Sequence, residues 1–345
     1  MKIAMATVPS AVPSLDTSSR PSVPKKSIEN QMNPSPSLNS ASAREQCASI
    51  KEQIARVVAA DENLVETLLI SMVAGGHTLI EGIPGIGKTL LARTMARCLG
   101  CEFRRIQFTN DLMPSDIVGT AIWRPSRERF TFSRGPLFSN IVLADEINRT
   151  SPRTLSCLLE AMENGTVSIE GRTVELAEPF LVWATRNPIE FHGTYPIPEA
   201  ALDRFLVRVE LTYPDREMEE ALYLGRNPEE HLEQLEPVLQ LDELRAMMAA
   251  AKEVSISEPV SNFCYRVVDA TRHHSAIVLG ASPRAALGWI HAARARAFLD
   301  NRTAVLPDDL IALARPVLAH RISLLGSGEA GDILGQILSQ TPVEL

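Results

Sequence analysis

The stretch Gly82-Ile83-Pro84-Gly85-Ile86-Gly87-Lys88-Thr89 decides the fold of this chain. It follows residues 77–82 (HTLIEG), an apolar run that predicts a buried strand, and it precedes residues 88–100, whose pattern predicts a helix. A glycine-rich loop that ends in Gly-Lys-Thr and lies between a strand and a helix is typical of a phosphate-binding loop. The glycines let backbone N–H groups point at phosphate oxygens, and the helix N-terminus adds partial positive charge. The residues predicted to bind a nucleotide are Gly82, Pro84, Gly85, Ile86, Gly87, Lys88, Thr89 and Leu90.

Side chains around this loop predict a magnesium site and a hydrolytic reaction. Lys88 is expected to reach the β- and γ-phosphates, and the Thr89 hydroxyl is expected to ligate Mg²⁺. Residues 140–146 (NIVLADE) predict a strongly apolar strand that ends in two carboxylates. Asp145 is expected to hold Mg²⁺, and Glu146 to polarise the attacking water. We expect ATP rather than GTP as the nucleotide, because the Asn-Lys-x-Asp motif that usually reads guanine is absent from the sequence.

Strand and helix patterns alternate around the loop. Further strands are predicted at residues 103–109, 180–187 and 205–211, and helices at 44–58, 62–75 and 151–164. This alternation predicts the α/β class, with a five-stranded parallel sheet of the P-loop NTPase type and helices on both faces.

The chain divides into three predicted parts. Residues 1–44 are rich in Pro and Ser and are expected to be disordered, because they cannot bury enough apolar surface to offset their ordering entropy. Residues 45–213 form the nucleotide-binding domain, with β-hairpins predicted at 119–135 and 166–176. Residues 214–345 have little β pattern and predict an all-helical domain.

Composition narrows the function classes. The net charge of the 345 residues is −8, and only 5% of them are aromatic, so a basic nucleic-acid footprint is not expected overall. No apolar run reaches 18 residues, so no transmembrane helix is predicted. Five cysteines, with no signal peptide recognised, predict reduced thiols and a cytoplasmic location. The Cys98–Cys101 pair has redox or zinc spacing but no second ligand pair nearby, so buried structural cysteines are favoured.

Four stretches make the chain resemble the AAA+ ATPases, and within them the MoxR family. They are GIPGIGKT at 82–89, LADEINRTSPRTLSCLLEAMENG at 143–165, ATRNPIEFHGTYPIPEAALDRF at 184–205 and SPRA at 282–285. The resemblance implies that Asn187 is the first sensor, Arg204 a trans-acting arginine finger and Arg284 a second sensor on a helical lid. Ser282 and Pro283 suit a helix start, which is consistent with Arg284 lying at a helix N-terminus. Arg186 departs from the family, where Gln is usual.

The resemblance also implies an assembly and a task. A trans-acting finger requires a ring, and six subunits are expected. The implied function is a Mg-ATP-dependent chaperone or remodelling factor, with proteins that carry von Willebrand factor A domains as clients. The two hairpins look like inserts that contact substrates in related machines. A nucleic-acid motor and a regulatory nucleotide switch that does not hydrolyse ATP are the alternatives.

Overall fold

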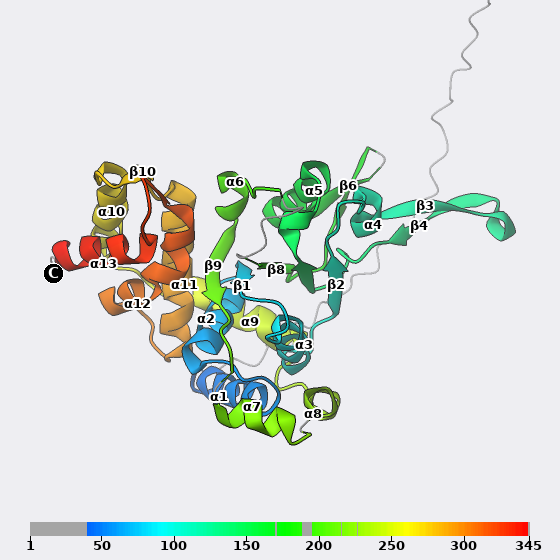
Figure 1. The fold of residues 1–345 in the computed structure, drawn as a ribbon, viewed down its shortest axis with the longest axis horizontal. Helices are drawn as coiled ribbons and strands as arrows, with labels where there is room; N and C mark the ends of the chain where they lie inside the picture. The colour runs from blue at the N-terminus through cyan, green and yellow to red at the C-terminus, as the bar shows by residue number, and fades with distance from the viewer. Residues whose placement is uncertain (1–39, 170, 188–194, 215, 226, 344–345) are drawn as a thin grey trace, which may run out of the picture. The chain divides into compact units, whose positions relative to one another are not determined.

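The computed structural model describes residues 40–343 apart from 170, 188–194, 215 and 226 (Figure 1). Most of the predicted disordered tail, residues 1–39, therefore lies outside the described residues. The first described helix, α1, spans Ser40–Val57, so the predicted tail boundary at residue 44 is wrong. Ala43 is fully buried in the main core, and this packing extends the helix into the segment assigned to the tail.

A five-stranded parallel sheet forms the centre of the nucleotide-binding part and confirms the predicted α/β class. Its strand order is β2-β5-β8-β1-β9, and every neighbouring pair is parallel. The strands are β1 His77–Glu81, β2 Phe103–Gln107, β5 Ile141–Asp145, β8 Leu181–Arg186 and β9 Phe205–Glu210. All residues of β1 and β5 are buried, which explains why these strands read as unbroken apolar runs.

Helices cover both faces of the sheet (Figure 1). On one face, alternate strand residues such as Leu143 and Trp183 pack in a core with α1, α2 (Glu62–Val73) and α3 (Lys88–Cys98). On the other face, their neighbours Val142 and Val182 pack in a second core. That second core contains α4 (Pro114–Val118) and α5 (Pro152–Asn164). The period of two along each strand separates these cores.

Two antiparallel hairpins lie outside the main sheet. The first pairs β3 (Gly119–Arg124) with β4 (Arg129–Arg134) through the short helix η1 (Pro125–Arg127), and it extends away from the sheet in Figure 1. The second pairs β6 (Thr166–Ile169) with β7 (Arg172–Glu175) directly after α5.

The segment after β9 is mainly helical. Its helices are α7 Arg216–Tyr223, α8 Pro228–Gln234, α9 Leu241–Lys252, α10 Glu258–His273, α11 Pro283–Leu299, α12 Pro307–Leu318 and α13 Ala330–Gln340. The expectation that this part is all-helical is wrong in one detail, because β10 (Ile277–Leu279) pairs with β11 (Ser323–Leu324). These strands are too short to leave an alternating pattern. No helix in the described part of the chain is long and apolar enough to cross a bilayer.

Because the five strands are parallel, their starts share one edge of the sheet and their ends share the other. We call these the amino edge and the carboxyl edge. His77, the first residue of β1, donates from Nε2 to the Met162 carbonyl (3.0 Å) and accepts at Nδ1 from the Val182 N–H (3.0 Å). Burial lowers the pKa of His77 to about 4, which keeps the ring neutral. The hydrogen bond between His77 and Met162 places the C-terminal end of α5 at the amino edge.

Candidate active site

The predicted phosphate-binding loop connects the carboxyl edge of the sheet, at β1, to the start of α3. A Cβ on Gly82 would lie 2.6 Å from the Leu211 carbonyl oxygen, so no side chain fits there. Gly87 caps the N-terminus of α3 with φ +93°, a left-handed conformation that favours glycine. Glycine is therefore needed at both positions, at Gly82 for steric reasons and at Gly87 for its backbone conformation. A loop that wraps closely around an anion has such requirements.

Lys88 lies across this loop. Its Nζ donates to the carbonyl oxygens of Gly82 (2.5 Å) and Ile83 (3.2 Å), so the ammonium is held inside the loop. Phosphate groups need hydrogen-bond donors and positive charge, which here come from the glycine loop, the helix N-terminus and the Lys88 ammonium. The residues present therefore fit a nucleoside triphosphate.

An apolar cavity of about 370 Å³ adjoins the loop. Pro84, Gly85, Ile86, Gly87 and Leu90 of the predicted site line it. The rest of the lining comes from residues that were not predicted to belong to the site, including Val57, Val58, Ala59, Tyr213, Leu222 and Tyr223. Ligand pockets are mostly apolar and aromatic, so this cavity suits a flat nucleotide base beside the phosphate site.

Asp145 ends β5 at the carboxyl edge and is 7% exposed. Its Oδ1 accepts from the Thr185 hydroxyl (2.5 Å), and its Oδ2 accepts from Arg105 Nε (3.1 Å) and Nη2 (2.6 Å). Thr89 lies in the first turn of α3. A carboxylate and a hydroxyl are oxygen ligands of the kind Mg²⁺ prefers, so the donor chemistry at the two predicted metal positions fits that ion.

Glu146 follows Asp145 with φ +59° and ψ +52°, a left-handed backbone that is uncommon outside glycine. Its backbone N–H donates to the Thr185 hydroxyl (2.9 Å), and its Oε2 contacts Gln107 Nε2 (3.2 Å) and Arg149 Nε (3.1 Å). Glu146 is thus held at its backbone N–H and at one of its carboxylate oxygens. Such strained residues cluster at functional sites, which agrees with the predicted catalytic position.

Asn187 follows β8 and is 5% exposed. Since β8 lies between β1 and β5, Asn187 falls between the phosphate loop and the two carboxylates along the carboxyl edge. The neighbouring Arg186 pairs with Glu81 (Nη2 to Oε1, 2.6 Å), and Glu81 is 8% exposed. The unusual cation in this strand is therefore paired with a carboxylate rather than left to face the nucleotide.

Arg204 and Arg284 lie together, but at the amino edge. Arg204 directly precedes Phe205, the first residue of β9, and Phe205 pairs with His77. Glu163 near the end of α5 contacts both arginines: Oε2 to Arg204 Nη2 and Oε1 to Arg284 Nη2, each 2.6 Å. The phosphate loop begins beyond the far end of β1, about 16 Å away along five strand residues. Within one subunit, neither arginine therefore lies at the phosphate loop.

Several residues of the site were not predicted from the sequence. They are Arg105, Gln107, Arg149, Thr185 and Glu163. Arg105 and Gln107 alternate along β2 and so share a face, a pattern visible in the sequence. Its meaning depends on β2 lying beside β5, which the sequence order of the strands does not reveal.

Thr185 is fully buried and bridges Asp145 to the backbone of Glu146. Thr185→Val keeps the side-chain shape but removes the hydroxyl, and it is expected to lower the free energy of unfolding by about 1–3 kcal/mol. Urea unfolding measures the change. Thr173→Val, at an exposed position of β7, is the matched control and is expected to change stability by less than about 0.5 kcal/mol. Equal stability of the two variants would contradict a structural contribution of the bridge.

Cys98 and Cys101 carry no sign of a metal or redox site. Both are free thiols, and burial raises the pKa of each to about 11, which disfavours the reactive thiolate. Within the described residues, no group of three or more metal-ligating side chains occurs that could hold an ion.

Two protein-family models match the chain. Residues 77–207 match the ATPase family associated with various cellular activities (AAA), and residues 269–337 match the AAA lid domain. The first match contains the phosphate loop, both carboxylates and Arg204, and the second contains Arg284.

The relatives and a solved structure agree with these matches. Chaperone MoxR1 of Mycobacterium tuberculosis is 41% identical over 297 residues, covering 83% of this chain and 78% of that protein. Protein MoxR of Paracoccus denitrificans is 33% identical over 295 residues, covering 78% and 86%. The crystal structure of a protein from Cytophaga hutchinsonii matches with a TM-score of 0.80 and 36% identity, covering 89% of this chain and 97% of that one. The chain belongs to the MoxR family of AAA+ ATPases.

Proposed function

We propose that this ATPase works as a closed ring, six subunits by family resemblance, in which each ATP lies between two subunits. One subunit supplies the phosphate loop, Asp145 and Glu146 from its carboxyl edge. Its neighbour supplies Arg204 and Arg284 from its amino edge. The observation that carries the proposal is the separation of these two half-sites by the length of β1. A head-to-tail contact brings opposite edges together.

The residues of the two half-sites have distinct tasks in the proposed reaction. Lys88 and the loop N–H groups bind the phosphates, and Thr89 and Asp145 would hold Mg²⁺. When bound, Mg²⁺ neutralises charge that develops on the phosphate oxygens. Glu146 orients and polarises the attacking water, with Asn187 beside it. The neighbour's Arg204 and Arg284 stabilise the negative charge of the transition state, where a fixed cation has its largest effect.

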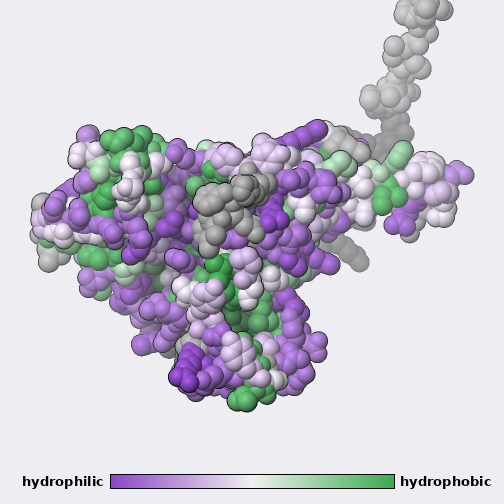
Figure 2. Space-filling model, viewed as in Figure 1, coloured by the Kyte–Doolittle hydropathy of each residue, from purple (hydrophilic) through white to green (hydrophobic). Residues whose placement is uncertain are grey.

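We further propose that hydrolysis serves the remodelling of protein clients, as a chaperone, and that von Willebrand factor A domain proteins are among them. The β3–β4 hairpin supports contact with a protein. Trp123 and Phe130 stack edge-to-face on it (5.2 Å) and are 49% and 68% exposed. In Figure 2 hydrophobic and hydrophilic side chains lie side by side over this hairpin. Exposed aromatic residues of this kind mark interaction sites. The five cysteines favour a reducing compartment such as the cytoplasm.

Mixing two inactive variants tests the shared site. Lys88→Ala removes the phosphate half-site and keeps the arginines, whereas Arg204→Ala does the reverse. Each variant alone is expected to be nearly inactive, and a 1:1 mixture should restore about one quarter of the interfaces, because each side of an interface is filled independently. ATP turnover after mixing and reassembly is the measurement.

The control is the double variant Lys88→Ala/Arg204→Ala mixed with the single Lys88→Ala variant, which can form no complete site. No recovery in the Lys88→Ala and Arg204→Ala mixture, at any ratio and with rings present by light scattering, would contradict the proposal.

A further inference from the structure

One carboxylate holds both arginines of the amino edge. Glu163 gives one oxygen to each, with Oε2 to Arg204 and Oε1 to Arg284 at 2.6 Å. We call these three residues the arginine cluster. It joins three elements that are far apart in the sequence: the end of α5, the turn before β9 and the start of α11.

The position of Glu163 is electrostatically unfavourable without the arginines. It is the penultimate residue of α5, and a helix C-terminus carries partial negative charge that disfavours a carboxylate. Hydrogen bonds from Arg204 and then Arg284 lower the pKa of Glu163, so it is ionised at neutral pH. Without this carboxylate, two guanidinium groups would face each other at close range. The three groups therefore depend on one another.

The ends of the two arginine side chains have few other restraints. Arg284 is 48% exposed, and among the described residues its side chain hydrogen-bonds only to Glu163. Arg204 also donates from Nη1 to the Ala200 carbonyl (2.7 Å), while its Nε is buried with no hydrogen-bond partner in the described part of the chain. Glu163 is thus the group that determines how far apart the two guanidinium groups lie.

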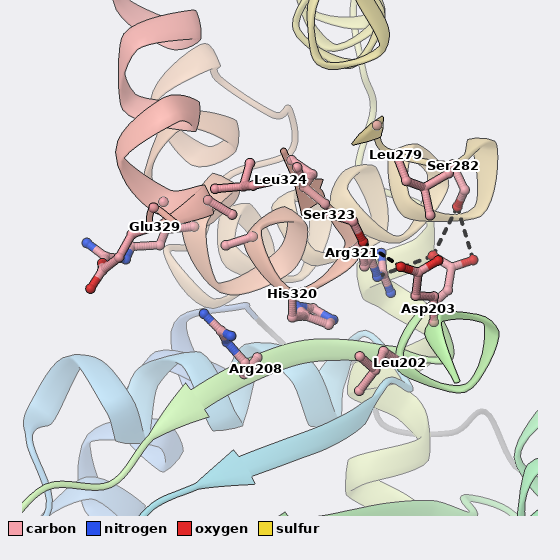
Figure 3. Close-up of a pocket in the computed structure, with 18 of the residues that line it drawn as sticks. Leu202, Asp203, Arg208, Leu279, Ser282, His320, Arg321, Ser323, Leu324 and Glu329 are labelled. Atoms are coloured by element: carbon pink, nitrogen blue, oxygen red, sulfur yellow. Dashed lines mark hydrogen bonds and ion pairs between the residues drawn. The ribbon is translucent and has the colours of Figure 1, made fainter. Parts of the chain in front are cut away.

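The backbones that carry the arginines are fixed separately, by contacts of residues near them in the chain. Figure 3 shows Asp203 with Ser282 and Arg321 around its carboxylate. Ser282 caps α11 and donates to both oxygens of Asp203, at 3.0 and 3.1 Å. Arg321 Nε lies 3.6 Å from Asp203 Oδ1 on the other side. Asp203 is adjacent to Arg204, and Ser282 is two residues before Arg284. This contact docks the start of α11 on the nucleotide-binding part, and Glu163 then sets the side chains.

We propose that Glu163 is a positioning residue that gathers Arg204 and Arg284 around a single anion and is exchanged for the γ-phosphate of the neighbouring subunit's ATP. Carboxylate and phosphate oxygens accept the same charge-assisted hydrogen bonds from guanidinium groups. The carboxylate therefore holds the two cations ready, at the spacing of one small anion, until the phosphate arrives. The inference rests on the proposed function, in which both arginines act on the neighbour.

Glu163→Gln tests this role, because the amide keeps the shape of the side chain but has no charge and replaces one of the two accepting oxygens with an NH₂ donor. It is expected to lower kcat roughly 10- to 100-fold, the scale of a misplaced catalytic group. The KM for ATP is expected to change less than about threefold, since the subunit's own phosphate loop lies at the other edge. Mixing with Lys88→Ala should restore turnover, because Lys88→Ala subunits supply intact arginine clusters. Glu160→Gln is the matched control. Glu160 lies one turn earlier on α5, and the only hydrogen bond of its side chain to another described residue comes from the Ser168 hydroxyl.

Three outcomes would overturn the inference. A wild-type kcat in Glu163→Gln rings shows that the arginines need no such gathering. A slow Glu163→Gln variant that Lys88→Ala does not rescue, while Arg204→Ala is rescued, shows that Glu163 acts only inside its own subunit. If Lys88→Ala rescues neither variant, the trans arrangement itself fails, and the role of Glu163 falls with it.

Discussion

Replacing Arg204 with alanine is expected to lower the kcat for ATP hydrolysis by roughly 10³–10⁵, the contribution of an arginine finger. The guanidinium lies with Arg284 and away from its own phosphate loop, so its loss should leave the Kd for ATP nearly unchanged. Turnover in assembled rings and equilibrium titration of ATP measure the two quantities. Arg204→Lys should recover little, because an ammonium lacks the planar set of donors.

The control for this prediction is an arginine on the surface of α7. Arg216→Ala removes an arginine that is 90% exposed and, within the described part of the chain, pairs only with Glu220 on its own helix, so kcat should stay at the wild-type value. Wild-type turnover in Arg204→Ala rings would remove this residue from the mechanism. A loss of ATP binding instead would place Arg204 in its own subunit's site.

Glu146→Gln is expected to bind ATP normally and to hydrolyse it roughly 10²–10⁴-fold more slowly, the usual contribution of a general base. The amide keeps the contacts that orient the side chain, including a partner for Arg149, but it cannot polarise water as a carboxylate does. Single-turnover hydrolysis and ATP titration separate the two effects. Lys88→Ala is the contrasting variant, since it should lose ATP binding itself.

The slow variant also tests the proposed clients. Held in the ATP state, Glu146→Gln rings should retain a partner protein that wild-type rings release, and mass spectrometry then identifies it. A von Willebrand factor A domain in the captured protein would support the proposed substrate class. DNA-stimulated turnover with a steep dependence on salt, and no captured protein, would favour a nucleic-acid motor instead.

The parts of the site that are local in the chain could be predicted from the sequence. The phosphate loop is eight consecutive residues, and Asp145 and Glu146 end one apolar strand, so no knowledge of the strand order was needed. The contacts between strands could not be predicted in the same way. Arg105 reaches Asp145 because β2 lies beside β5, and Thr185 does so because β8 lies on the other side.

The two arginines and the apolar cavity beside the phosphate loop also depend on contacts that the sequence does not reveal. The resemblance implied roles for Arg204 and Arg284, but only the parallel register places them at the opposite edge from the loop. The cavity beside the loop combines segments near residues 57, 86 and 213, which no local pattern connects. The short strands β10 and β11 were missed because two or three residues cannot show a period.

In the proposed ring, the opposite placement of the two half-sites gives the assembly a direction. Each proposed contact between subunits has one side that supplies the arginines and one side that supplies the phosphate loop. Opposite edges of one sheet cannot both meet the same partner, so a pair of subunits holds at most one complete site. An open chain of subunits always has one site fewer than it has members. Only in a closed ring does the number of complete sites equal the number of subunits. A ring closed by such head-to-tail contacts has two unlike faces and one sense of rotation.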